Sequence, residues 1–202
     1  MGDYLWVEDG DQLFIRTYNP AYCAHYGWEY HRAIAFASYL SGYKLAADFL
    51  VEKAIEEAKK HHIEVIDTLI YPIIFIYRQF MELSIKDIYI NYTPLHREES
   101  KSIIKESHSL IKAWEYIKPF AIEVSDEDED QLKDVDLIED YIKQFEEVSK
   151  ISTEYRYPIN KENNVILKGD TYLDLNNLKE KMQKFANFFD GLAGAMDHYF
   201  NS

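Results

Sequence analysis

The sequence predicts an all-α protein, an up-and-down bundle of about five main helices in a single domain that spans residues 1–202. Hydrophobic residues make up 47% of the 202 positions, which is enough for a sizeable core. Only seven glycines and five prolines are present, so turns are few and helices are long. Apolar residues also recur every three or four positions through most of the chain, which is the period of a helix with one buried face.

The first segment, residues 1–19, is predicted to be an N-terminal arm, because it mixes aromatic and acidic residues and ends at Asn19-Pro20. A long helix, or a broken pair of helices, is expected from about residue 20 to residue 60. Ser41-Gly42 is the expected bend, since glycine weakens a helix interior by about 1 kcal/mol relative to alanine.

Residues 63–92 form the most apolar long segment and are predicted to be the central helix. No charged residue occurs between positions 69 and 77. Arg78, Glu82 and Lys86 then follow at four-residue spacing, which places them on one narrow stripe of a helix. A helix that is apolar on almost every other side is normally buried, so the other helices are expected to pack around it.

The next helix is expected from about residue 105 to residue 118, with Ser107 or Ser109 as its N-cap and Pro119 limiting its end. An acidic loop is predicted at residues 123–132, because its carboxylates repel one another and favour solvation.

A further helix should begin at Asp130 or an earlier acidic residue and run to about residue 150. A short non-helical or hairpin insertion is expected near residues 151–172, and the last helix from about residue 173 to residue 200. Gly191 and Gly194 in the last helix offer a close helix contact. The inward face of the helix before the insertion is predicted to consist of Leu137, Ile138, Tyr141, Ile142, Phe145 and Val148.

Composition excludes several classes of function. The net charge of −14 argues against extended DNA binding, which needs clustered lysine and arginine. The single cysteine, Cys23, excludes an intramolecular disulfide and fits a cytoplasmic protein. No apolar run reaches the roughly 20 residues of a membrane span. Neither a glycine-rich phosphate loop nor a His-Glu-x-x-His motif occurs, and we expect no cofactor.

The charged stripe of the central helix is the candidate site. Unpaired buried charges are costly, so these side chains must pair with one another, with other segments or with a ligand. In one interpretation they form an intrahelical ladder; in the other, Arg78 and Lys86 meet an anion or another chain in a polar pocket. Arg156, between two tyrosines, is then the best additional cation, and His108 is the best nearby titratable group.

Metal binding is a separate alternative. His25 and Glu29 on one segment, and His61 and His62 on another, would face each other in a metal-dependent bundle enzyme. Neither segment has the Glu-x-x-His spacing of di-iron bundles, so we assign no metal ligands.

Three motifs occur in a fixed order: Tyr-Arg-x-x-x-Glu-x-x-x-Lys at residues 77–86, His-x-Leu at 108–110 and Arg-Tyr-Pro at 156–158. In this order, they resemble uncharacterised bacterial proteins of the HEPN superfamily. The resemblance implies an all-α bundle, often dimeric, of a kind frequent in RNA-cleaving toxins and phage-defence systems. Ribonuclease members carry Arg-x(4–6)-His. No arginine of this chain has a histidine five to seven residues later.

We therefore expect a non-catalytic HEPN-like domain that forms a homodimer. It would bind a protein partner, a nucleotide or RNA, in a bacterial phage-defence or toxin–antitoxin context. The expected ligand-binding residues are Arg78, Glu82, Lys86, Arg156 and Tyr157.

The alternative is a divergent ribonuclease or a nucleotide-modifying enzyme that needs no metal. His108 and Glu82 are its candidate catalytic residues, with His108 as general acid or base. Arg78 and Arg156 would stabilise phosphate charge.

Overall fold

The structure is a computed structural model that describes residues 6–15, 18–19, 21–94, 108–148, 158, 162–164 and 172–201. The chain divides into two compact units, residues 1–30 and residues 31–202. The described part of the second unit contains five helices and no strand, so the predicted all-α bundle is confirmed. Most of the insertion predicted near residues 151–172 lies outside the described residues.

The first unit has no helix among its described residues. It contains a turn at Asn19, whose backbone carbonyl accepts from the amide of Cys23 at 2.8 Å. The helix predicted from residue 20 begins only at Arg32, so that prediction is wrong by about three turns. Gly27, with a φ of 73°, lies in the left-handed region, which a continuous right-handed helix does not contain.

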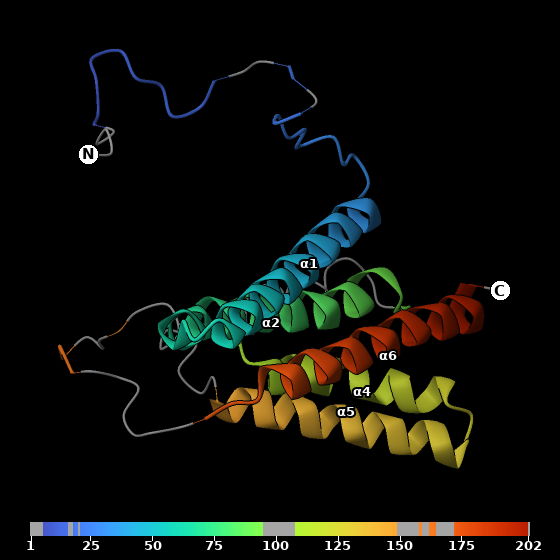
Figure 1. Cartoon of the computed structure of the whole chain (residues 1–202). Coiled ribbons are helices and arrows are strands. Elements are labelled where there is room, and N and C mark those ends of the chain that lie inside the picture. Colours follow the sequence, from blue (N-terminus) through green and yellow to red (C-terminus); the bar gives the residue numbers. More distant parts are fainter. Residues whose placement is uncertain are drawn as a thin grey trace. The chain divides into compact units, whose positions relative to one another are not determined.

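The first two helices, α1 (Arg32–Lys59) and α2 (Ile63–Asn91), pack along each other (Figure 1). The helix does not break at the bend predicted for residues 41–42, because α1 runs through these positions as one helix. A tight turn joins α1 to α2, and in it His61 has a φ of 67°. At its far end α2 stops at Asn91, one residue before the predicted end, and residues 92–94 lie outside the helix.

The remaining helices are α4 (Leu110–Val124), α5 (Glu129–Val148) and α6 (Leu175–Asn201). The described helices α1, α4 and α6 all pack against α2, and α4 also packs against α5 and α6 (Figure 1). This arrangement confirms α2 as the central helix. Its large buried apolar face includes Ile73, Tyr77, Met81, Ile85 and Ile88.

Polar side chains cap three of these helices. The Ser109 hydroxyl accepts from the Lys112 amide at 3.3 Å, so Ser109 is the N-cap of α4. Asp128 accepts from the amides of Asp130 and Gln131 at the start of α5, both at 3.0 Å. At α6, Asp174 accepts from the amides of residues 176 and 177. Each cap satisfies backbone donors that a helix N-terminus leaves without a partner.

Two predicted boundaries were wrong. Pro119 lies inside α4, which continues to Val124. An interior proline costs about 3 kcal/mol, but burial of Ala121 and the contact of Phe120 with Phe200 (ring centroids 6.0 Å apart) favour the longer helix. The acidic loop is also shorter than residues 123–132, because only residues 125–128 separate α4 from α5. Acidic residues in the first turn of α5 interact favourably with its helix dipole.

Aromatic rings join α6 to the rest of the core. Phe185 and Phe189 of α6 stack with ring centroids 4.4 Å apart. Phe185 meets Phe80 of α2 edge-on at 6.1 Å, and Phe189 lies 6.2 Å from Trp114 of α4. Both phenylalanines of α6 are therefore part of the core, and burying such rings supplies much of the core's stability.

Other packing predictions were wrong. Leu137 and Val148 of α5 are exposed, because the stripe of Val135, Ile138 and Ile142 faces the core instead. No close helix contact forms at Gly191 or Gly194 among the described residues, since a Cβ atom at either glycine would have nothing within 4 Å. None of the described helices has the length and apolar character needed to cross a membrane.

Candidate functional site

The candidate site is a buried polar ladder on α2, formed by Arg78, Glu82 and Lys86. Arg78 Nη1 lies 3.2 Å from Glu82 Oε2, and Lys86 Nζ donates to Glu82 Oε1 at 2.6 Å. The three residues are only 8%, 5% and 8% exposed. The charges therefore pair with one another one helical turn apart, with the carboxylate held between two cations.

Neighbouring helices complete the ladder. Arg78 Nη2 donates to the backbone carbonyl of His108, just before α4, and lies 3.8 Å from Glu146 Oε2 of α5. The same Glu146 oxygen accepts from the amide of Leu110, the first residue of α4, at 3.1 Å. Arg78 and Glu146 thus tie α2, the start of α4 and α5 together at one point.

His108 stands at the solvent edge of this arrangement. Its Nδ1 lies 3.6 Å from Glu82 Oε1, while 85% of its side chain is exposed. The structure thus brings together Arg78, Glu82, Lys86 and His108, four of the residues predicted for the site. Arg156 and Tyr157 lie outside the described residues.

The charges of the ladder are nearly balanced, which limits its chemistry. Arg78 and Lys86 both direct donors at Glu82, and Arg78 also faces Glu146. Two pockets of the described chain lie elsewhere: one between α1, α2 and α6, the other between α4, α5 and α6, and no ladder residue lines either. The cations of the ladder are therefore engaged with carboxylates rather than directed into one of these pockets.

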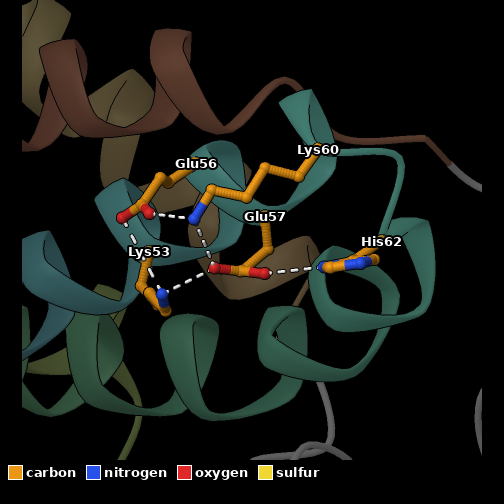
Figure 2. Close-up of polar contacts among 5 residues, drawn as sticks. All are labelled: Lys53, Glu56, Glu57, Lys60 and His62. Atoms are coloured by element: carbon orange, nitrogen blue, oxygen red, sulfur yellow. Dashed lines mark hydrogen bonds and ion pairs between the residues drawn. The ribbon is translucent and has the colours of Figure 1, made fainter.

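The histidines of the α1–α2 turn belong to a different cluster. His62 Nδ1 lies 2.8 Å from Glu57 Oε2 (Figure 2). The other Glu57 oxygen accepts from Lys53 at 2.6 Å and from Lys60 at 3.1 Å. Hydrogen bonds from His62, Lys53 and Lys60, in that order, lower the pKa of Glu57 to about 2.

This cluster bears on the metal alternative. His62 points at a glutamate that two lysines already neutralise (Figure 2). His25 and Glu29 belong to the other unit of the chain. Within the described residues no group of three or more histidine, cysteine, aspartate or glutamate side chains is placed to hold a metal ion.

Sequence reasoning missed a second buried network, which joins α1 to α2 and α6. The Tyr77 hydroxyl donates to Asp48 Oδ1 at 2.6 Å. Lys44 Nζ lies 2.6 Å from Asp48 Oδ2 and donates to Gln183 Oε1 at 3.1 Å. Burial, followed by the bond to Asp48, raises the pKa of Tyr77. The four-residue spacing of Lys44 and Asp48 was the available signal.

A second polar line on α2 was also missed. Ser84, Asp87 and Asn91 lie on another face of α2 from the ladder, three or four residues apart. Asn91 donates to Asp87 Oδ1 and accepts from Arg32 Nε at 2.7 Å. Burial raises the pKa of Asp87. The spacing of these three residues was visible in the sequence, but no basic residue nearby drew attention to it.

Comparison of this chain with protein-family models, with curated proteins and with solved structures finds no match.

The first prediction concerns the ladder. Glu82→Gln removes the anion that Arg78 and Lys86 share, so two buried cations lose their main partner. We expect the free energy of unfolding to fall by about 3–5 kcal/mol, measured by urea denaturation. Glu52→Gln, which removes an exposed carboxylate paired with Lys179, is the matched control and should cost less than about 1 kcal/mol. Equal losses of stability in the two variants would contradict the conclusion that the buried cations of the ladder depend on Glu82.

The second prediction concerns pH. The pKa of Glu57 is about 2 in the folded protein and about 4.3 in an unfolded chain, so the unfolded state takes up the proton first as pH falls. Glu57 therefore stabilises the fold above about pH 4.5, and this contribution disappears between about pH 4.5 and pH 2.

Urea denaturation of wild type and Glu57→Gln between pH 6 and pH 2 tests this. We expect the wild-type advantage to shrink steadily below pH 4.5, because the unfolded wild-type chain then takes up a proton at Glu57 that the folded state does not, and to vanish near pH 2, where both proteins are neutral at position 57. Glu147→Gln, an exposed change on α5, should keep the wild-type pH dependence. A constant difference between wild type and Glu57→Gln over the whole range would refute the assignment.

Proposed function

We propose that this chain is a non-catalytic, HEPN-like helical domain that works as a homodimer and binds another protein. The observation that carries the non-catalytic part is the pairing within the ladder. Glu82 accepts from both Arg78 and Lys86, and all three are buried. A general acid or base needs a proton-transfer path to a substrate, and phosphate stabilisation needs cations with free donors.

An exposed apolar stripe on α1 supports the homodimer. Ile34, Leu45 and Phe49 are 41%, 53% and 59% exposed, and their spacing places them on one face. Ser38, Ser41 and Gly42 lie between them on the same face. A Cβ atom at Gly42 would have nothing within 4 Å, so the centre of the stripe is open to close approach.

The order of residues along the stripe suits an antiparallel pair of α1 helices. Three residue pairs are symmetric about the midpoint between positions 41 and 42: Ile34 with Phe49, Ser38 with Leu45, and Ser41 with Gly42. In a two-fold interface, each of these residues would meet its counterpart on the second copy, with the smallest side chains at the crossing point. The large apolar side chains then flank that crossing on both sides.

The chemistry of the second partner follows from the charge. A net charge of −14 disfavours a long nucleic-acid track and favours a protein with a basic surface. The motif order that resembles the HEPN superfamily motivates a phage-defence or toxin–antitoxin context for this complex. A nucleotide or RNA partner is the alternative within the same proposal.

The third prediction tests the dimer. Wild type should elute with twice the mass of one chain in size-exclusion chromatography with light scattering, and Leu45→Lys should elute as a monomer. A buried lysine in the middle of an apolar interface loses solvation without gaining a partner. Leu137→Lys, at an exposed leucine of α5, is the matched control and should leave the mass unchanged.

Cross-linking tests the antiparallel arrangement in a Cys23→Ser background. Ser38→Cys chains mixed with Leu45→Cys chains should form a mixed disulfide faster than either chain links to itself. A monomeric wild type would refute the dimer. Preferential self-linking of both variants would refute the antiparallel register.

One observation favours a second candidate, the divergent ribonuclease. His108 is exposed and lies 3.6 Å from Glu82, so a buried carboxylate stands beside a solvent-accessible imidazole. Such a pair can orient a histidine that transfers protons. The neighbouring Arg78 would have to release Glu82 or Glu146 before it reached a phosphate.

The fourth prediction separates the two candidates. Under the non-catalytic proposal, purified protein cleaves neither single-stranded nor tRNA-sized RNA above a buffer control, and His108→Ala changes nothing in this assay. Cleavage that wild type and Glu52→Gln share but His108→Ala lacks would overturn the non-catalytic proposal in favour of the ribonuclease.

A further inference from the structure

A pocket of about 370 Å³ opens between α1, α2 and α6, on another side of α2 from the ladder. Its wall includes the apolar side chains of Leu40, Phe80, Ile88 and Phe189. This volume lies within the range of about 300–1,000 Å³ that is typical of small-molecule sites, which combine apolar walls with a few polar groups.

Two carboxylates that form no ion pair with a described residue line this pocket. Asp87 of α2 is half-buried and accepts a hydrogen bond from the neutral amide of Asn91, while the positive charge of Arg32 acts on it without an ion pair. Asp190 of α6 has neither a hydrogen bond nor an ion pair with any described residue. Glu82, by contrast, faces two cations in the ladder. A half-buried carboxylate in an apolar wall costs solvation free energy that a bound cation would recover.

Asp87 and Asp190 share the lining of this pocket with Tyr92, and their charges act on its hydroxyl. Burial raises the pKa of the Tyr92 hydroxyl, and the negative charges of Asp87, Asp197 and Asp190 raise it further. Tyr92 itself lines the pocket. The potential at this end of the pocket is therefore negative.

Lys44 is the cation in the lining, and its charge is already matched. Its Nζ lies 2.6 Å from Asp48 Oδ2 and donates to Gln183 Oε1 at 3.1 Å. Asp48 in turn accepts from Tyr77, which holds the pair in place. With Lys44 and Asp48 balanced, the charges of Asp87 and Asp190 remain, and Arg32, outside the lining, offsets part of the charge of Asp87.

We propose that this pocket binds an organic cation, namely a primary amine carried on a compact apolar body. The ammonium group donates hydrogen bonds to the carboxylates of Asp87 and Asp190, and the apolar body packs on Phe80 and Phe189. An ammonium is the group that satisfies both carboxylates at once, and the apolar walls select against fully hydrated inorganic cations.

This site goes beyond the proposed dimer and does not depend on it, since every residue that lines it belongs to one chain. Of the stripe residues, Ser41 also lines the pocket, whereas Leu45 and Phe49 do not. Amine binding measured on the monomeric Leu45→Lys variant therefore tests the pocket even if the dimer proposal fails. The mass of the wild-type protein likewise tests the dimer even if no amine binds.

The experiment is isothermal titration calorimetry of the full chain at pH 7 in about 150 mM salt, where the Debye length of about 8 Å suppresses diffuse attraction to the acidic surface. The probes are 2-phenylethylamine, neutral 2-phenylethanol and anionic 3-phenylpropionate. We expect the amine to bind at least tenfold more tightly than the alcohol, and the acid to show no binding.

Three variants locate the site. Asp190→Asn, on an exposed turn of α6, should weaken amine binding at least fivefold, and Asp87→Asn should do the same. Ala193→Leu places a larger side chain in the lining and should abolish binding without changing any charge. Asp134→Asn, which removes an equal charge from the pocket between α4, α5 and α6, is the control and should bind like wild type.

The proposal is overturned if the amine binds no more tightly than the alcohol, or if no heat is detected at millimolar amine. It is also overturned if Asp134→Asn weakens binding as much as Asp190→Asn, because that result marks general attraction to an acidic protein. Asp190→Asn keeps the test valid even if Asp87→Asn does not fold.

Discussion

The fold of this protein depends on a carboxylate that is buried in the middle of its central helix. Glu82 lies between Arg78 and Lys86 on α2, and Arg78 continues the chain of contacts to Glu146 of α5 and to the backbone before α4. Two charges taken out of water are tolerated only where each finds a partner. The ladder therefore fixes how α4 and α5 dock on α2, while the apolar face of the same helix receives α1 and α6.

The central helix thus separates three surfaces with different roles. One face is apolar and forms the core, one carries the ladder, and a third carries Ser84 and Asp87 at the pocket shared with α1 and α6. In the ladder every carboxylate has a cation within reach, which suits a structural role. At the pocket, Asp190 has no ion pair with a described residue and Asp87 has only the nearby charge of Arg32, which suits a cationic ligand. Paired charges on one face of α2 therefore support the non-catalytic proposal, and the excess of negative charge on another face supports the amine site.

Local patterns in the sequence predicted part of what depends on residues close together in the chain. Four-residue spacing identified the ladder, and apolar spacing identified α2 and α6, but the equally local pair of Lys44 and Asp48 was missed. Contacts between helices were not predictable, because nothing in the sequence sets the register of one helix against another: Glu146 beside Arg78 and Gln183 beside Lys44 are examples. Two helix boundaries were wrong for a related reason. Tertiary packing extends α4 past Pro119, and α1 begins at Arg32, after the left-handed Gly27.

The central claim is that Glu82 and Lys86 stabilise the protein mainly by satisfying each other. A double-mutant cycle with Glu82→Leu, Lys86→Leu and the double variant, followed by urea denaturation, tests it most directly. Arg78 keeps Glu146 as a partner in every variant. The account predicts a favourable coupling of about 1.5–3 kcal/mol, with the double variant no less stable than Glu82→Leu alone. A coupling free energy within error of zero would contradict it, because Glu82 and Lys86 would then contribute to stability independently of each other.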